Sequence, residues 1–311
     1  KTTGKYKNWF NVQRSDGKEN HSVNLESVEF EMLNNPDAEY AMMITIPKEE
    51  QNSPECLEAK IKELAKLESF ETYSTVPDEG QERISTTWVM TNKGSEVRAR
   101  LTARGYEETS DIQKDSPTLC KSTLRIILCI AATKRWKVET TDIKSAFLQG
   151  SQLERDVFIK PPKEANVDKG FLWKLNKCLY GLKDASRQWY FKVRGKLIDA
   201  NFSQSEQDPG LFVMHDNVGK TVGIVGLHVD DFIHAGSDSF NDSILYPILK
   251  SFQVGKNEKE NFMYTGFYIK QSGDSIVLDQ SKYTKSTVEI IEMDPKRMKE
   301  KTSDLTESER T

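Results

Sequence analysis

Three aspartates have the surroundings expected of a site that binds divalent cations. Asp230 and Asp231 interrupt the apolar run GIVGLHVDDFIHAG at residues 223–236, and Asp142 lies within VETTDIKSAFL at residues 138–148. An ionised carboxylate among Ile, Val, Leu and Phe is unfavourable unless a cation or hydrogen-bond donors compensate its charge. Mg²⁺ prefers carboxylate and water oxygens and shares its coordination shell with substrate phosphates. The three residues therefore predict a phosphoryl-transfer site in which two ions activate a hydroxyl and stabilise the leaving group.

Two strand-like segments would bring these aspartates together. A hairpin with strands over residues 221–229 and 232–235 would leave Asp230 and Asp231 at its turn. A third strand over residues 137–141 would place Asp142 at its end. Each aspartate also has an ordinary alternative: the pair can form a solvated turn, and Asp142 can be the N-cap of a helix that begins near Lys144.

The surrounding blocks of sequence resemble a known polymerase family. TTDIKSAFLQG, LNKCLYGLKDASRQWY and LHVDDFIHAG occur in that order, VRARLTARGYEE precedes them, and FMYTGFYI and LDQSKYTKS follow. Together these blocks resemble the reverse transcriptase domain of copia-type LTR retrotransposon Pol polyproteins, over residues 55–293. The resemblance implies an α+β right-hand polymerase fold with fingers, palm and a partial thumb, in which an antiparallel palm sheet packs on helices.

The same resemblance implies a role for each matching residue. The aspartates and the Ile143 carbonyl would hold Mg²⁺, with Mn²⁺ as a substitute, while dNTPs are added to a primer 3′ end. The implied residues are, for catalysis and metal binding, Asp142, Ile143, Asp230 and Asp231; for the nucleotide, Arg98, Arg100, Lys144, Ser145, Ala146, Phe147, Tyr180 and Gly181; and for template–primer, Lys183, Arg187, His228 and Gly266. Backbone N–H groups of residues 144–146 would face the triphosphate. Phe147 would exclude a 2′-hydroxyl, with core packing as its alternative.

Local patterns support part of this interpretation. Residues 97–103 alternate so that Arg98 and Arg100 share one strand face, which suits phosphate binding but also a solvated sheet. Lys183 could equally belong to a solvated basic turn. The four-residue spacing of Trp189, Val193 and Leu197 predicts a buried helical stripe.

Further elements follow from caps, periodicity and turn residues. Ser53 and Pro54 predict the start of a helix with an amphipathic stripe at Leu57, Ile61 and Leu64. Strands are expected at residues 86–90 and 97–103 around a turn at 92–95, helices at 122–132 and 239–252, an excursion at 151–170, and a hairpin at 262–280 that turns at 272–274.

Three departures from the family pattern keep other functions open. The family usually has Tyr where this chain has His228, Leu-Gly where it has Thr265-Gly266, and Gln-Ala-Pro-Arg where residues 184–187 read Asp-Ala-Ser-Arg. A catalytically inactive remnant or a co-opted nucleic-acid-binding module is therefore the main alternative. A metal-dependent nuclease would also need carboxylates, but it would not explain Phe147 or the Tyr180-Gly181 block.

Charge and composition fit a nucleic-acid enzyme. The net charge of the 311-residue chain is −4, yet residues 91–205 hold 22 Lys and Arg against 13 Asp and Glu, which would attract phosphates. The four cysteines are widely spaced and form no Cys-x-x-Cys pair, a pattern that does not predict a zinc site. We expect a polar connector at residues 1–52, fingers and palm at 53–275, and a partial thumb with a charged tail at 276–311.

The longest apolar run, residues 126–132, is too short to span a membrane, so no membrane partner is expected. The expected partners are an RNA or DNA template–primer, dNTPs, and RNase H and integrase regions of the same polyprotein, of which this chain would be a fragment. The expected location is intracellular, in the cytoplasm or within virus-like particles.

Overall fold

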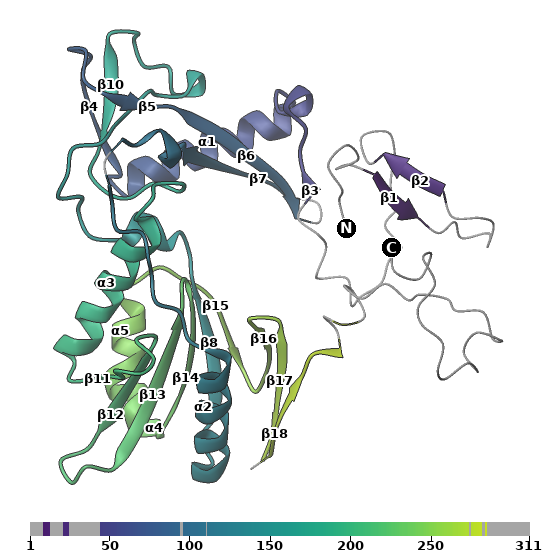
Figure 1. The fold of residues 1–311 in the computed structure, drawn as a ribbon, viewed down its shortest axis with the longest axis vertical. Coiled ribbons are helices and arrows are strands. Elements are labelled where there is room, and N and C mark those ends of the chain that lie inside the picture. Colours follow the sequence, from purple (N-terminus) through teal and green to yellow (C-terminus); the bar gives the residue numbers. More distant parts are fainter. Residues whose placement is uncertain are drawn as a thin grey trace, which may run out of the picture.

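A computed structural model describes the fold of residues 9–12, 21–24, 44–93, 96–109, 111–273, 275–281 and 284 (Figure 1). It is a mixed α/β structure with several antiparallel sheets. The largest sheet has six strands in the order β11-β12-β13-β14-β8-β15. These strands are β8 (Val138–Ile143), β11 (Ser203–Gln204), β12 (Leu211–His215), β13 (Thr221–His228), β14 (Asp231–Gly236) and β15 (Val254–Lys259).

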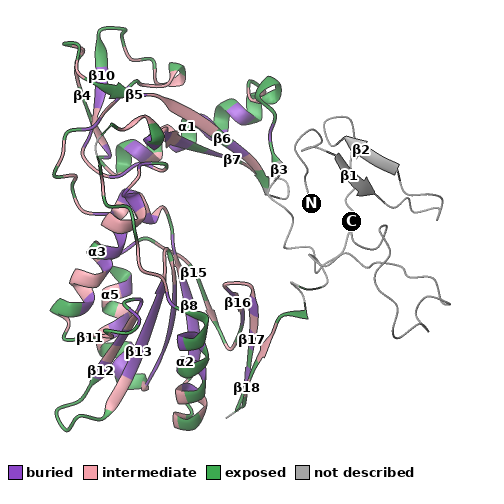
Figure 2. Ribbon diagram, in the orientation of Figure 1, coloured by how far each residue is buried: buried purple, intermediate pink, exposed green. Residues whose placement is uncertain are grey.

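Helices cover both faces of the six-stranded sheet, which explains why its central strands are almost continuously apolar. Along β14, Phe232 packs with α3 and α5, whereas Ile233 packs with α2 on the opposite face. Figure 2 shows the resulting burial of the central strands. The helices are α2 (Lys121–Lys134), α3 (Ala185–Asp199), α4 (Asp238–Phe240) and α5 (Tyr246–Lys250), with a π-helical turn at Asn241–Leu245 between the last two.

A second region, at the top of Figure 1, is built from two smaller sheets and α1 (Pro54–Ser69). One sheet has the order β3-β6-β7, and α1 packs against β7. The other has the order β4-β10-β9-β5. Their strands are β3 (Ile44–Thr45), β4 (Tyr73–Pro77), β5 (Arg83–Ile84), β6 (Thr86–Lys93), β7 (Glu96–Ala103), β9 (Phe158–Ile159) and β10 (Phe171–Leu175).

The remaining elements lie at the two ends of the chain or connect larger ones. The strands β16 (Asn261–Tyr264), β17 (Phe267–Ser272) and β18 (Ser275–Asp279) form an antiparallel sheet that packs with α2. The strands β1 (Trp9–Val12) and β2 (His21–Asn24) pair with each other. Short 3-10 turns occur at Lys48–Glu50, Gly105–Glu107, Ala146–Gln149 and Lys163–Ala165. In the described part of the chain, no helix has the length and apolar character needed to cross a membrane.

Most of the predicted elements are confirmed, with small shifts at their ends. Ser53 caps α1 as expected, because its side chain accepts a hydrogen bond from the Cys56 N–H (3.3 Å). The Trp189, Val193 and Leu197 stripe is buried in α3. The predicted helix over residues 239–252 is present as α4, the π-helical turn and α5. The predicted turn residues 94, 95 and 274, and nearly all of the expected thumb, lie outside the described residues.

Two sequence interpretations are wrong. The N-cap alternative for Asp142 fails because this residue pairs within β8, and only a 3-10 turn follows, beginning at Ala146. The amphipathic stripe of α1 is also misplaced, because Leu57 and Ile61 are exposed while Glu63 is buried. The physical reason is that the inward face of α1 is stabilised by ion pairs and small residues instead of by a continuous apolar row.

Candidate active site

The hairpin of β13 and β14 brings the adjacent aspartates to one end of the six-stranded sheet. His228 pairs with Asp231, so Val229 and Asp230 form a two-residue turn. Val229 has a φ of 56°, a conformation that is unfavourable for a β-branched residue. The surrounding structure holds this turn: the Trp189 indole N–H donates to the Val229 carbonyl (2.8 Å), and the Ile143 N–H donates to the Asp230 carbonyl (3.0 Å).

The strand β8 places the third aspartate directly beside this hairpin. Asp142 is the register partner of Asp231 on the neighbouring antiparallel strand. The Cα atoms of such partners lie about 4.5–5.5 Å apart. Asp230 follows in the adjoining turn, so residues far apart in the sequence form one acidic cluster, as the sequence predicts.

The acidic cluster carries an electrostatic penalty that a cation would relieve. Burial and, to a smaller extent, the negative charges of Asp230 and Asp142 together raise the pKa of Asp231 to about 6. A divalent cation would stabilise the ionised carboxylates, and oxygen donors of this kind suit Mg²⁺. Among the described residues, however, no three His, Cys, Asp or Glu side chains converge closely enough to hold an ion. The donors therefore fit Mg²⁺ in type and backbone position, whereas the side chains would have to turn toward it.

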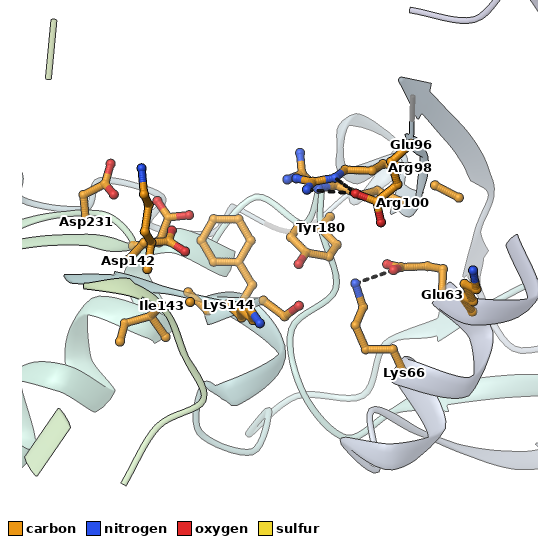
Figure 3. Close-up of a pocket in the computed structure, with 18 of the residues that line it drawn as sticks. Glu63, Lys66, Glu96, Arg98, Arg100, Asp142, Ile143, Lys144, Tyr180 and Asp231 are labelled. Carbon is orange, nitrogen blue, oxygen red and sulfur yellow. Dashed lines mark hydrogen bonds and ion pairs between the residues drawn. The ribbon is translucent and has the colours of Figure 1, made fainter. Parts of the chain in front are cut away.

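A cleft of about 830 Å³ extends from the acidic cluster to α1 and β7. Figure 3 shows Asp142 and Asp231 at one end, Arg98, Arg100, Glu63 and Lys66 at the other, and Tyr180 between them. The predicted site residues that line this cleft are Arg98, Arg100, Asp142, Ile143, Lys144, Ser145, Ala146, Phe147, Tyr180, Asp230 and Asp231. The others, Gly181, Lys183, Arg187, His228 and Gly266, are not part of its lining.

Two aromatic rings form the middle of the cleft. The Phe147 and Tyr180 rings are tilted against each other, with their centroids 5.6 Å apart. Phe147 also packs partly against the hydrophobic cores on both sides, so its position combines core packing with exposure to the cleft. On the far side of the ring pair, the Arg100 guanidinium carbon lies 5.6 Å from the Tyr180 centroid, within the range of a cation–π interaction.

The turn after β8 differs in one respect from its expected role. The Lys144 N–H donates to the Gln253 carbonyl (2.9 Å), so this backbone group is already paired within the protein. The Lys144 side chain still lines the cleft, beside Ser145 and Ala146. Ser145 has a φ of 52°, which turns the chain sharply into the 3-10 turn that begins at Ala146.

Gly181 is required by packing within the protein. Its φ is +87°, and a Cβ atom there would lie 2.1 Å from the Ala103 carbonyl oxygen. The Ala103 N–H also donates to the Tyr180 carbonyl (2.7 Å). The close backbone approach predicted for Gly181 is therefore made to the end of β7, and this contact fixes Tyr180 relative to Arg100.

The expected template–primer residues contact different parts of the protein. The Lys183 ammonium donates to the Glu108 carbonyl (2.7 Å), and Arg187 donates to the Asp115 carbonyl (2.9 Å) and the Gln113 side chain (2.9 Å). Both cations thus anchor the segment between β7 and α2. His228 lies next to the aspartate turn in a T-shaped arrangement with Tyr264, with the ring centroids 6.5 Å apart. Gly266 is in the turn between β16 and β17 with a φ of +84°.

Comparison with known proteins identifies the family. A family described as reverse transcriptase (RNA-dependent DNA polymerase) matches residues 70–301. The chain belongs to this reverse transcriptase family. It is similar to the retrovirus-related Pol polyproteins from transposons RE1 and RE2 of Arabidopsis thaliana, with 32% and 29% identity over 63% of this chain, and to that from transposon TNT 1-94 of Nicotiana tabacum, with 28% identity over 73%.

These relatives are copia-type Pol polyproteins, as the sequence motifs predict. The matched segments make up only 14%, 14% and 18% of the three relatives, so this reverse transcriptase chain spans a small part of their length.

Two groups of residues at this cleft have no signal in the sequence. Glu63 and Lys66 enter it from α1, and no motif marks them. Gly255 of β15 lies against the acidic cluster, where a Cβ atom would be 2.0 Å from the Asp142 Oδ2. Only the position of β15 beside β8 reveals this contact, because the sequence around Gly255 carries no signal for it.

A buried polar cluster also stabilises β8, the strand that carries Asp142. The Tyr246 hydroxyl donates to the Glu139 Oε1 (2.7 Å), which also pairs with the Lys259 ammonium (3.0 Å). His234, the register partner of Glu139, contacts the Thr141 hydroxyl (3.1 Å). Burial lowers the pKa of His234 to about 4. This cluster links β8 to both of its neighbouring strands immediately before Asp142.

Proposed function

We propose that this chain catalyses RNA-directed DNA synthesis by adding dNTPs to a primer 3′ end. The observation that carries the proposal is the register pairing of Asp142 with Asp231 beside Asp230, at the end of a cleft whose opposite wall carries Arg98 and Arg100. A triphosphate needs cations along its length and a metal-binding carboxylate cluster at its reacting phosphorus.

The proposed architecture is a right-hand polymerase. The six-stranded sheet with α2, α3 and α5 would be the palm, and the sheet of β3, β6 and β7 with α1 would belong to the fingers. The fingers and palm would span residues 53–275, preceded by a connector over residues 1–52 and followed by a partial thumb over 276–311. The family assignment supports this arrangement, as does the position of the cleft between the two regions.

In this proposal Asp142, Asp230, Asp231 and the Ile143 carbonyl hold Mg²⁺ or Mn²⁺. Bound divalent ions would supply charge neutralisation at the phosphates and activation of the attacking hydroxyl. The protein's own contribution is to hold these carboxylates at adjacent positions on β8, on β14 and in the turn before β14. Burial and the neighbouring charges raise the pKa of Asp231 to about 6, and a bound cation would favour the ionised form of this carboxyl.

The remaining cleft residues would bind and select the nucleotide. Arg98, Arg100 and the Lys144 side chain would contact the triphosphate, together with the backbone of Ser145 and Ala146. Phe147 would lie beneath the sugar and exclude a 2′-hydroxyl, and Tyr180 with Gly181 would border the new base pair. Lys183, Arg187, His228 and Gly266 would contact the template–primer along the surface outside the cleft.

The polyprotein context supplies the proposed partners. RNA or DNA template–primer and dNTPs would be the substrates, and RNase H and integrase regions of the same polyprotein would act with this chain inside the cell. The similarity to Pol polyproteins supports this part of the proposal.

Primer extension on a poly(rA)–oligo(dT) hybrid with Mg²⁺ or Mn²⁺ tests the function. Asp230→Asn should reduce extension by about 10³-fold or more, because it removes a charged donor from the reacting centre. Asp242→Asn is the matched control, since Asp242 is exposed on the π-helical turn and does not line the cleft. Unchanged extension by folded Asp230→Asn would contradict the proposal.

A second candidate is an inactive remnant or a nucleic-acid-binding module. The observation that favours it is the lack of a converged three-residue metal site among the described residues, together with His228 in the position before the aspartate turn. Salt-sensitive binding of the hybrid without metal-dependent extension would select this candidate. Degradation of the hybrid without extension would indicate a nuclease instead.

A further inference from the structure

The helix α1 presents a charged face to the cleft, and the proposed function leaves this face without a role. Glu63 and Lys66 are three residues apart, so their side chains share one face of the helix. Both line the cleft that also contains the acidic cluster and Arg100. Figure 3 shows the two side chains paired on the wall opposite Asp142 and Asp231.

Glu63 is an unusual residue to bury between a helix and a strand. It is 4% exposed, its Oε2 forms an ion pair with the Lys66 ammonium, and its Oε1 has no hydrogen-bond partner among the described residues. Burial raises the pKa of this carboxyl, whereas Lys66 and then Arg100 act in the opposite direction. An apolar side chain would pack α1 against β7 without this electrostatic penalty. The carboxylate is therefore better explained by the cations that it holds.

Lys66 and Arg100 are arranged around a single aromatic ring. The Lys66 Nζ lies 5.9 Å from the Tyr180 centroid, and the Arg100 guanidinium carbon lies 5.6 Å from it. The Lys66 side chain is 33% exposed, so its ammonium is held by Glu63 and Tyr180 while remaining open to the cleft. Two cations fixed in this way, from different elements, form a binding surface for a polyanion.

We propose that Lys66 is a further nucleotide-binding residue, which contacts the triphosphate together with Arg100, and that Glu63 is the positioning residue that directs Lys66 into the cleft. This inference rests on the proposed function, because it deepens the assignment of the same cleft. On nucleotide binding, the Lys66 ammonium moves from Glu63 toward a phosphate, and Glu63 limits how far it can travel.

The kinetic test is primer extension with varied dTTP on the poly(rA)–oligo(dT) hybrid. Lys66→Ala should raise the KM for dTTP about tenfold, the effect of losing one charge-assisted contact, with kcat changed less than about threefold. Lys66→Arg should restore most of the affinity, and Glu63→Gln should raise KM by about threefold by releasing the ammonium. Lys220→Ala is the matched control, because Lys220 is exposed and is not part of the cleft lining. An unchanged KM in Lys66→Ala would overturn the inference.

A binding measurement separates failure of this inference from failure of the proposed function. Inorganic tripolyphosphate should raise the Tm of the wild-type chain, and the shift should fall by at least half in Lys66→Ala but not in Lys220→Ala. If the wild type does not extend primers, the proposed function fails, and this comparison still tests the anion site. Equal Tm shifts with tripolyphosphate in the wild type, Lys66→Ala and Lys220→Ala would overturn the inference. An equally reduced Tm shift in Lys66→Ala and Lys66→Arg would also overturn it, because Lys66 would then have only a structural role.

Discussion

Replacing Gly255 with alanine should impair the acidic cluster while leaving the fold intact. A Cβ atom at this position would lie 2.0 Å from the Asp142 Oδ2, whereas ordinary van der Waals contacts begin at 3.4 Å. The atoms must therefore separate by more than about 1 Å, a displacement that can cost about 10²-fold in rate at a reacting centre. Gly255 is on β15, the strand beside β8, so the added methyl group would occupy the position of the Asp142 carboxylate in the acidic cluster.

The assay for Gly255→Ala is single-nucleotide extension at saturating dTTP, with Mg²⁺ titrated in each protein. We expect kcat to fall about 100-fold and the Mg²⁺ concentration for half-maximal rate to rise, because the carboxylate is displaced from its place beside Asp231. Gly195→Ala is the control: a Cβ atom at Gly195 meets nothing within 4 Å, so extension should stay unchanged. A correctly folded Gly255→Ala variant with wild-type kcat and Mg²⁺ dependence would refute the reasoning.

Two further predictions concern the selection of deoxyribonucleotides over ribonucleotides and the pH dependence of stability. Phe147→Val should increase the use of ribonucleotides relative to deoxyribonucleotides by about tenfold or more, measured as the ratio of kcat/KM values, because it replaces the aromatic ring that lines the cleft with a much smaller side chain. An unchanged ratio would assign Phe147 to core packing alone. Burial lowers the pKa of His234 to about 4, below its ordinary value of 6.5, so only the unfolded chain gains this proton between those values. Wild-type unfolding free energy should therefore fall by roughly 2 kcal/mol from this residue between pH 7 and pH 5, and His234→Gln should remove that loss in urea titrations. If the unfolding free energies of the wild type and His234→Gln change in parallel with pH, the low pKa of His234 is contradicted.

The central sheet could be predicted because each of its strands is specified by a pattern within a short segment of the sequence. The apolar run around Asp230 and Asp231 predicts the hairpin of this sheet. In the smaller sheet of β3, β6 and β7, the alternation at Arg98 and Arg100 likewise predicts the face that lines the cleft. Strand pairing then brings Asp142 beside the hairpin with no additional assumption about distant side chains.

The walls of the cleft were less predictable because their contacts join distant segments. In α1, the rule that apolar residues face inward selects Leu57 and Ile61, yet both are exposed. The buried positions include Lys60, which pairs with Glu164 (2.8 Å), a residue that no local pattern links to α1. Gly255 likewise has a defined role only once β15 lies beside Asp142. Periodicity reports the average preference of a face and cannot reveal an ion pair with a remote partner.

The cations of the cleft differ in the groups that neutralise their charge, and this difference predicts the order in which they bind a nucleotide. Arg98 forms an ion pair with Glu96 (3.1 Å) and Lys66 forms one with Glu63. Arg100 lies against the face of Tyr180, and Glu63 attracts it without a direct ion pair among the described residues. A triphosphate would compete with a carboxylate at the first two cations, but it would add to a cation–π contact at the third. Arg100 is therefore the expected anchor for an arriving nucleotide, and Lys66 engages once the phosphate can replace Glu63.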